Sequence, residues 1–131
     1  MSTATITPGR QFFNEHMEYV FRKDFAGMVA DTYTDDCVLI HNFPFFDSPP
    51  PYTVRGKQAI IDAETTIFEH QGDIEAGEPF NFVEGDDFIA FQIIVTSPHT
   101  GRWLINDYWD LRDGKIARYF AYGYHLEADA P

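Results

Sequence analysis

The chain has 131 residues, 17% of them aromatic, and its 21 acidic and 9 basic residues give a net charge of −12. An acidic chain repels phosphate groups and anionic lipids, so nucleic acid and membrane surfaces are poor candidates for partners. The length suits one domain spanning residues 1–131, and the aromatic excess predicts a dense core or a cavity lined by rings.

The cysteine content and the terminus bear on the compartment. The single cysteine, Cys37, excludes an internal disulfide and a cysteine-rich zinc site. It lies within the apolar run CVLI, so we expect a buried structural thiol. No apolar run approaches the roughly 18 residues that cross a bilayer, and the N-terminus lacks the layout of a signal peptide. We therefore expect a soluble, cytoplasmic protein.

Two helices are expected first. After Pro8, apolar residues recur at steps of three and four residues from Phe12 to Phe21, which is typical of an amphipathic helix. A shorter helix is expected over Lys23–Tyr33, with Asp24 as its N-cap.

A strand, a loop and a third helix follow. Cys37–Asn42 is rich in β-formers and predicts the first strand. Phe43–Val54, FPFFDSPPPYTV, contains three consecutive prolines, which exclude a helix or a central strand. Its aromatic residues favour an ordered loop that covers an apolar surface. A helix is expected from Gly56 to about Gln71, with its acidic residues Asp62 and Glu64 on the solvated side.

After Asp73 the apolar period changes from about 3.6 to about 2 residues, which indicates strands. Four are expected, joined by turns, over Glu78–Glu84, Phe88–Thr96, Arg102–Arg112 and Lys115–Tyr124. The resulting order predicts an α+β fold in which a curved, mostly antiparallel sheet wraps around helices as a cone. Such an α+β barrel would hold an internal pocket.

One carboxyl group in this sheet is expected to lie among large apolar side chains. The run WLINDYWDL is expected to be a strand, in which alternate side chains share a face. Asp107 then shares its face with four large apolar residues, Trp103, Ile105, Trp109 and Leu111. A carboxylate in such surroundings pays a desolvation cost unless it finds a partner or keeps its proton. Active sites often contain carboxyl groups of this kind, although a structural aspartate bonded to a tyrosine or a backbone amide is the alternative.

The element order and three sequence motifs together resemble the nuclear transport factor 2-like superfamily, in particular its SnoaL-like branch of polyketide cyclases. The motifs are YTDDCVLIHN, the GKQAI opening of the third helix, and the closing WDLRDGKIARYFAYG. The resemblance covers about Phe12 to Tyr124 and is specific for the fold rather than for a reaction.

This superfamily includes ketosteroid isomerase, whose active site keeps an aspartic acid protonated at neutral pH. The resemblance puts the isomerase's protonated aspartate on Asp107 and its general base on His41. Its tyrosine donor falls near His16, within a turn of Tyr19. Asp107 and His41 would then form an acid–base pair, assisted by Tyr19 or His16. The alternatives are that His41 is a core residue, that His16 serves packing and that Tyr19 belongs to the core.

Further side chains are expected to line the pocket and contact a ligand: Asn42, Trp103, Trp109, Phe45, Phe46 and Tyr122. The five histidines show no metal-binding spacing, and no glycine-rich nucleotide motif is present, so we expect neither metal nor cofactor.

The expected function is therefore binding of a small apolar or polycyclic ligand, with cofactor-independent isomerisation, cyclisation or dehydration. The alternative is a ligand-binding or oligomerisation module without chemistry. A third candidate, epoxide hydrolysis, would need an arginine and two aspartates that converge on a water. The resemblance also implies a homodimer that associates through the sheet.

Overall fold

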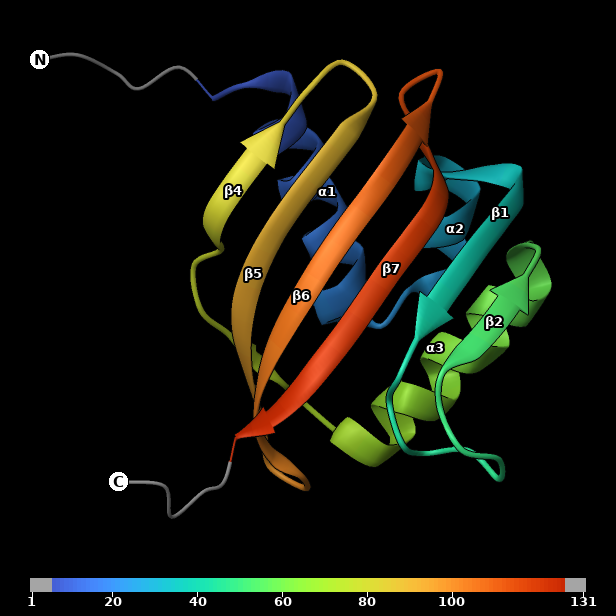
Figure 1. Cartoon of the computed structure of the whole chain (residues 1–131), viewed down its shortest axis with the longest axis vertical. Helices are drawn as coiled ribbons and strands as arrows, with labels where there is room; N and C mark the ends of the chain where they lie inside the picture. Colours follow the sequence, from blue (N-terminus) through green and yellow to red (C-terminus); the bar gives the residue numbers. More distant parts are fainter. Residues whose placement is uncertain (1–5, 127–131) are drawn as a thin grey trace, which may run out of the picture.

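The computed structural model describes residues 6–126. Three helices pack on one side of a strongly bent sheet (Figure 1). This arrangement confirms the expected α+β cone, with helices gathered against the concave face.

The first two helices begin at side-chain caps. Helix α1 (Pro8–Arg22) starts where the Thr7 hydroxyl accepts a hydrogen bond from the Arg10 amide. Helix α2 (Phe25–Thr32) starts after Asp24, whose carboxylate accepts a bond from the Gly27 amide at 2.9 Å. The expected N-cap is confirmed, and the helix is shorter than Lys23–Tyr33 because the cap lies inside that range.

Helix α3 (Lys57–Gln71) follows Gly56, as expected. The strands are β1 (Tyr33–His41), β2 (Tyr52–Arg55), β3 (Glu75–Ala76), β4 (Phe80–Glu84), β5 (Phe88–Ser97), β6 (Gly101–Arg112) and β7 (Lys115–Leu126). Their order is β2-β1-β7-β6-β5-β3, and β4 also pairs with β5. All pairs are antiparallel except β1 with β7. Within the described residues the two edges of the sheet do not pair, so the cone is open and is not a closed barrel.

Three strand assignments differ from expectation. Strand β1 begins at Tyr33 rather than Cys37, directly at the end of α2. Strand β2 lies largely within Phe43–Val54, which was expected to be a loop. The prolines precede β2, which pairs only with β1 and therefore forms an edge of the sheet, where proline-rich flanks are tolerated. The two-residue strand β3 was not expected.

The core lies between the concave face and the helices. Alternate residues of β5, from Ile89 to Ser97, are buried, and on β6 Trp103, Asp107 and Trp109 are the buried residues. The expected alternation along β6 is therefore confirmed. Cys37 is fully buried, as expected of a structural thiol.

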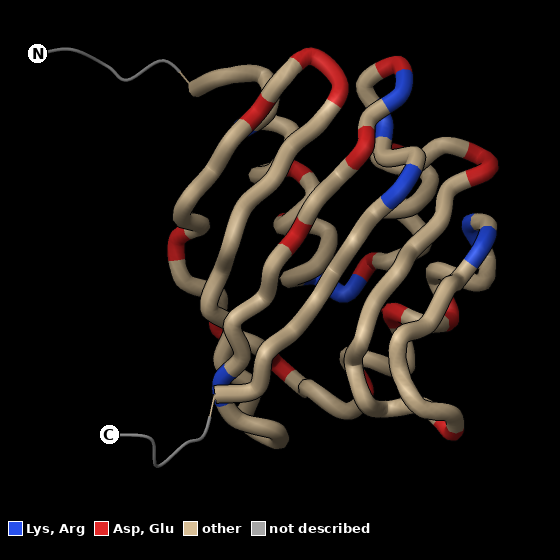
Figure 2. The backbone as a smooth tube through the Cα atoms, in the orientation of Figure 1, with Lys and Arg blue, Asp and Glu red and all other residues tan. Residues whose placement is uncertain are grey.

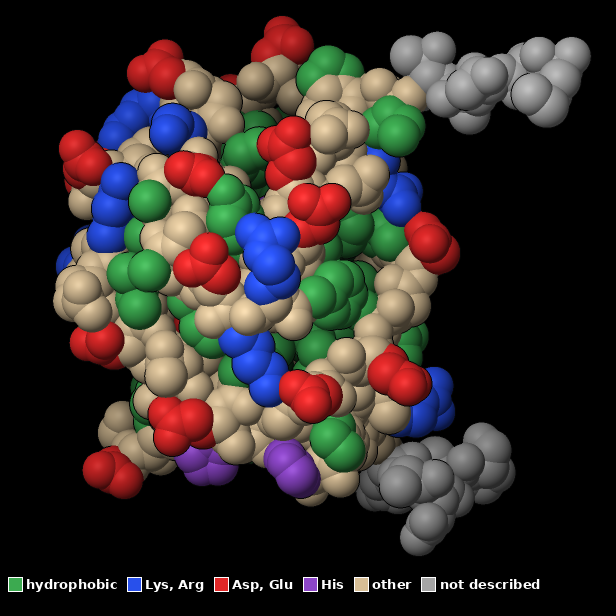
Figure 3. Space-filling view, turned by 180° about the vertical axis from the view of Figure 1, so that it is seen from behind, with side chains coloured by type: hydrophobic (Ala, Val, Ile, Leu, Met, Phe, Trp, Pro, Cys, Tyr) green, Lys and Arg blue, Asp and Glu red, His purple; other side chains and the backbone are tan. Residues whose placement is uncertain are grey.

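Charged residues are few in the middle of the sheet. Asp and Glu concentrate at turns and on helices, and the central parts of the strands carry few charges (Figure 2). On the helical side, acidic and basic side chains are interspersed rather than gathered into one patch (Figure 3). None of the helices within residues 6–126 is long and apolar enough to cross a membrane.

Candidate active site

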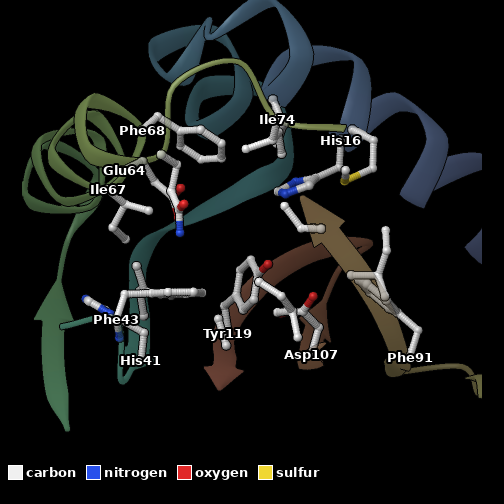
Figure 4. Close-up of a pocket in the computed structure, with 18 residues that line it drawn as sticks. His16, His41, Phe43, Glu64, Ile67, Phe68, Ile74, Phe91, Asp107 and Tyr119 are labelled. Atoms are coloured by element: carbon white, nitrogen blue, oxygen red, sulfur yellow. Dashed lines mark hydrogen bonds between the residues drawn. The ribbon is translucent and has the colours of Figure 1, made fainter. Parts of the chain in front are cut away.

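A cavity of about 90 Å³ lies between the concave face of the sheet and helices α1 and α3. Most of its wall is aliphatic or aromatic. Six polar side chains also line it: His16, His41, Glu64, Gln71, Asp107 and Tyr119 (Figure 4).

The strand register explains how residues distant in sequence meet in this wall. His41 on β1 pairs with Ala121 on β7, which pairs with Asp107 on β6, which pairs with Phe91 on β5. Side chains of one cross-strand row point to the same face, and all four line the cavity. Because neighbouring strands lie about 4.8 Å apart, the backbones at His41 and Asp107 are roughly 10 Å apart. The two side chains therefore reach one ligand from two sides rather than each other.

Asp107 is the buried carboxyl group that the sequence singled out. It is 7% exposed, and its Oδ1 atom has no hydrogen-bond partner within the described residues. Burial raises its pKa from 3.8 to about 8, the Tyr119 hydroxyl opposes that shift as a hydrogen-bond donor, and the charge of Glu64 adds to it. The group is therefore mostly protonated at neutral pH.

Tyr119 is a neighbour of Asp107 that sequence reasoning missed. It lies on β7 opposite Trp109, one position along the inner face from Ala121. Burial holds its pKa well above 10, so its hydroxyl keeps its proton and can donate to a ligand oxygen or to Asp107.

Glu64 contradicts the expectation of a solvated residue. Asp62 is exposed, but Glu64 faces the cavity from α3, across from Tyr119 and Asp107 (Figure 4). Burial raises its pKa from 4.5 to about 7. The signal was present in the sequence, because Glu64 is four residues after Ile60 and four before Phe68, on the inner stripe of the helix.

His16 lines the cavity from α1. Its ring lies 4.6 Å from that of Trp109, and its Nδ1 atom is buried without a hydrogen-bond partner. Burial lowers its pKa from 6.5 to about 3, so the imidazole is neutral at physiological pH.

His41 is held in one orientation. Its Nδ1 accepts a hydrogen bond from the Phe43 amide at 3.1 Å, so in the neutral ring the proton lies on Nε2. Burial lowers its pKa to about 4. The ring packs towards the β2 side, with its centroid 5.0 Å from that of the Tyr52 ring and 5.3 Å from that of the Phe46 ring. At neutral pH His41 is thus a hydrogen-bond donor, not a free base.

Two of the residues expected near the ligand have other partners. The Tyr19 hydroxyl donates to Asp31 on the outside of the molecule, and Tyr19 is not part of the cavity wall. Asn42 exchanges two hydrogen bonds with the backbone of Gly123, at 3.0 and 2.7 Å, and so fastens the end of β1 to β7.

The aromatic residues expected to line the pocket, apart from Tyr122, lie behind or beside its wall rather than in it. Trp109 is fully buried behind the wall, against Phe13 and Phe91. Trp103 and Phe45 contact each other at 6.1 Å beside the cavity, and Phe46 packs on Tyr52 and His41. Phe43, from the same proline-rich segment, does line the wall.

Tyr122 lies on the opposite, outer face of the sheet and is 41% exposed. The reason is a β-bulge between β6 and β7, where Leu111 pairs with Ile116 but Asp110 pairs with Arg118. The extra residue reverses the alternation, so Tyr119 and Ala121 point inwards and Tyr122 outwards.

Within residues 6–126 no group of three or more His, Cys, Asp or Glu residues is placed to hold a metal ion. No protein-family model matches the sequence, and no curated protein matches it.

Solved structures identify the fold. A "putative isomerase" from Bacillus subtilis is 22% identical, with a TM-score of 0.67 over 89% of this chain and 86% of that one. An NTF2-like protein of unknown function from Burkholderia pseudomallei is 18% identical, with a TM-score of 0.69 over 94% and 93%. An NTF2-like protein from Anabaena variabilis is 16% identical, with a TM-score of 0.70 over 100% and 99%. The chain therefore has the nuclear transport factor 2-like fold, as its sequence motifs suggested.

Proposed function

We propose that this protein binds a small, largely apolar ligand in its cone and catalyses cofactor-independent acid–base chemistry on it, with Asp107 as the proton donor. Isomerisation, cyclisation and dehydration all belong to this class of reaction. The observation that carries the proposal is the buried, unpartnered Oδ1 of Asp107 at the cavity wall. A structural aspartate would be expected to bond a protein donor at both oxygens, because an unsatisfied buried acceptor is costly.

The surroundings of Asp107 support a donor role. A carboxyl group with a pKa near 8 holds its proton at pH 7 and can pass it to a ligand oxygen that gains negative charge. Tyr119 and the Nε2–H of His41 would supply further donors. Tyr119 is better situated for this than Tyr19, whose hydroxyl is bonded to Asp31 on the surface.

The size of the cavity favours a small ligand. An engineered cavity of about 150 Å³ accommodates benzene, and this cavity measures about 90 Å³. A ligand of one ring or less suits that space, and a polycyclic ligand would require the wall to move.

Two other functions make different demands on the site. A ligand-binding module would use the same cavity without proton transfer. An epoxide hydrolase would need an arginine, and neither Lys nor Arg is among the residues that line the described cavity. Acid–base chemistry therefore has the stronger support.

Hydrogen–deuterium exchange at the α-carbons of cyclopentanone tests the proposal. The ketone is small and apolar, and its enolate oxygen would accept the Asp107 proton. The wild-type protein is expected to accelerate the exchange in D2O above the buffer rate. Asp107→Asn should lower the protein-catalysed rate by about 100-fold, the lower end of general acid–base effects. Proton NMR measures the exchange.

The exposed Asp62 provides a matched control, and Asp62→Asn should exchange at the wild-type rate. Binding of the ketone without exchange would instead support the ligand-binding module. Hydrolysis of cyclopentene oxide would support the epoxide hydrolase.

We further propose that two copies associate through the outer face of the sheet. Tyr108, Tyr122 and Tyr124 are 38%, 41% and 65% exposed on this face, where the strands carry few charges (Figure 2). Sedimentation equilibrium is expected to show a dimer. Tyr122→Lys should weaken it at least about 10-fold, because a charge would be buried without a partner. Phe21→Lys, on α1, should leave the dimer intact, and a monomeric wild type would refute it.

A further inference from the structure

Glu64 is a second carboxyl group at the cavity wall, half-buried, and it has no role in the chemistry described above. Its side chain points inwards from α3, between the side chains of Ile67 and Phe68 (Figure 4). Within the described residues it has no hydrogen-bond or ion-pair partner, and burial alone accounts for its altered pKa. A carboxyl group held in this way has lone pairs directed at the cavity and free for a ligand.

The charge of Glu64 affects the pKa values of side chains on three other elements. Burial is the main cause of the raised pKa of Asp107 on β6, Tyr119 on β7 and Tyr33 at the start of β1, and the charge of Glu64 adds to each. The other titratable side chains of the cavity are His16 on α1 and His41 on β1, and both stay neutral at physiological pH. Glu64 and Asp107 are thus two acidic groups that share one apolar space, and none of the described residues that line it is a Lys or Arg.

The two histidines are poor proton acceptors in this space. The Nδ1 lone pair of His41 already accepts a hydrogen bond from the Phe43 amide, so the ring can take a second proton only at Nδ1, by breaking that bond. His16 titrates near pH 3, so its conjugate acid is too strong for the ring to be an effective base at pH 7. Among the described residues that line the cavity, Glu64 is therefore the remaining candidate for the base.

We infer that Glu64 is the general base of the cavity and takes a proton from the ligand while Asp107 donates one to it. This inference rests on the proposed function. With a ketone, the Glu64 carboxylate removes an α-proton, and the C–H electrons form the C=C bond. The carbonyl π electrons move to oxygen, which receives the Asp107 proton. With a β,γ-unsaturated ketone, Glu64 would return its proton to the γ-carbon while the dienol O–H gives its proton back to Asp107, which completes an isomerisation and restores both carboxyl groups.

The pair also limits the charge in the cavity. Before the transfer Glu64 is ionised and Asp107 neutral, and afterwards Asp107 is ionised and Glu64 neutral. The protein carries one negative charge in the cavity throughout, so the step never requires two adjacent carboxylates in an apolar space. The charge of one group disfavours ionisation of the other, so the state in which both are ionised is avoided.

This arrangement predicts a bell-shaped pH profile for cyclopentanone exchange. The rate should rise as Glu64 loses its proton near pH 7 and fall as Asp107 loses its own near pH 8. Glu64→Gln should remove the rising limb and lower the exchange rate by about 100-fold. Asp107→Asn should remove the falling limb. Glu69→Gln is the matched control, since Glu69 is exposed on the same helix.

A carboxyl-carbon NMR titration provides a readout that does not depend on catalysis. In Glu64→Gln the midpoint of Asp107 should move to lower pH, because a neighbouring negative charge is gone. Glu64→Asp keeps the acceptor and should retain part of the exchange activity together with both limbs of the profile. Glu69→Gln should leave the Asp107 midpoint unchanged.

The outcomes separate the two proposals. If Asp107→Asn loses exchange but Glu64→Gln retains it with both limbs, Glu64 is not the base and the proposed function stands. If the wild type exchanges no faster than buffer, the proposed function and the role of Glu64 fall together. An Asp107 midpoint that does not move in Glu64→Gln would overturn the pairing itself.

Discussion

Replacing Trp109 with alanine is expected to lower the free energy of unfolding by about 4 kcal/mol, the range measured for large aromatic residues in cores. The side chain is fully buried, and its ring lies 4.6 Å from His16, 5.3 Å from Phe91 and 5.6 Å from Tyr119. All three neighbours line the cavity, so the loss should loosen the wall as well as the core. Urea unfolding followed by circular dichroism measures the change.

Phe21→Ala is the control, because Phe21 is 54% exposed on α1 and contributes little packing. Its effect should stay within about 0.5 kcal/mol, as for other surface substitutions. A loss below about 1 kcal/mol in Trp109→Ala would mean that this ring does not support the core as its contacts suggest.

The elements with strong periodicity could be predicted from sequence. Strands β5 and β6 run from Phe88 to Ser97 and from Gly101 to Arg112, within a residue of their expected bounds. Alternation is decisive there because one face is buried. Strand β2 carries no such signal, because it has four residues and its side chains alternate only between half-buried and exposed positions.

The candidate site could be predicted only where local spacing was reliable. Asp107 was visible because its strand neighbours are large and apolar. Tyr119 was not, since the bulge that turns it inwards depends on how β6 and β7 pair, and nothing local to β7 marks the extra residue. Ile116 and Tyr119 are both inner residues although they are three positions apart, which a strict period of two would forbid.

Glu64 illustrates a different difficulty. Its place on the inner stripe of α3 was readable from its spacing, but a glutamate rarely faces an apolar cavity without a partner. The general preference of acidic residues for solvent outweighed the helical geometry. A charged residue that falls on an apolar stripe is therefore informative in a helix for the same reason that Asp107 is informative in a strand.

At pH 8, Asp107→Asn is expected to be more stable than the wild type. The free energy of unfolding of the variant minus that of the wild type should be about 2–4 kcal/mol larger at pH 8 than at pH 4. The folded state raises the pKa of Asp107 from 3.8 to about 8, so the folded protein holds this proton more tightly than the unfolded chain. The associated stability is fully present below pH 3.8 and is lost as the pH rises towards 8, at up to about 1.4 kcal/mol per pH unit. Asparagine does not ionise, so at this position the variant loses no stability as the pH rises. Urea unfolding at a series of pH values measures both proteins.

The two cavity histidines determine the pH range in which the effect of the carboxyl groups on stability can be measured. Burial lowers the pKa of His16 and His41 from 6.5 to about 3 and about 4, so their contribution is present above pH 6.5 and is lost in acid. Between about pH 4.5 and 6.5 the unfolded chain gains up to two protons on these rings, while the folded protein holds up to two more on Asp107 and Glu64. The opposing effects nearly cancel there, and only between pH 6.5 and 8 do the carboxyl groups act alone. Wild-type stability should fall in that window, whereas the double variant Glu64→Gln/Asp107→Asn should hold steady. A wild type with constant stability from pH 6.5 to 8 would show that neither carboxyl group keeps its proton in the folded cavity.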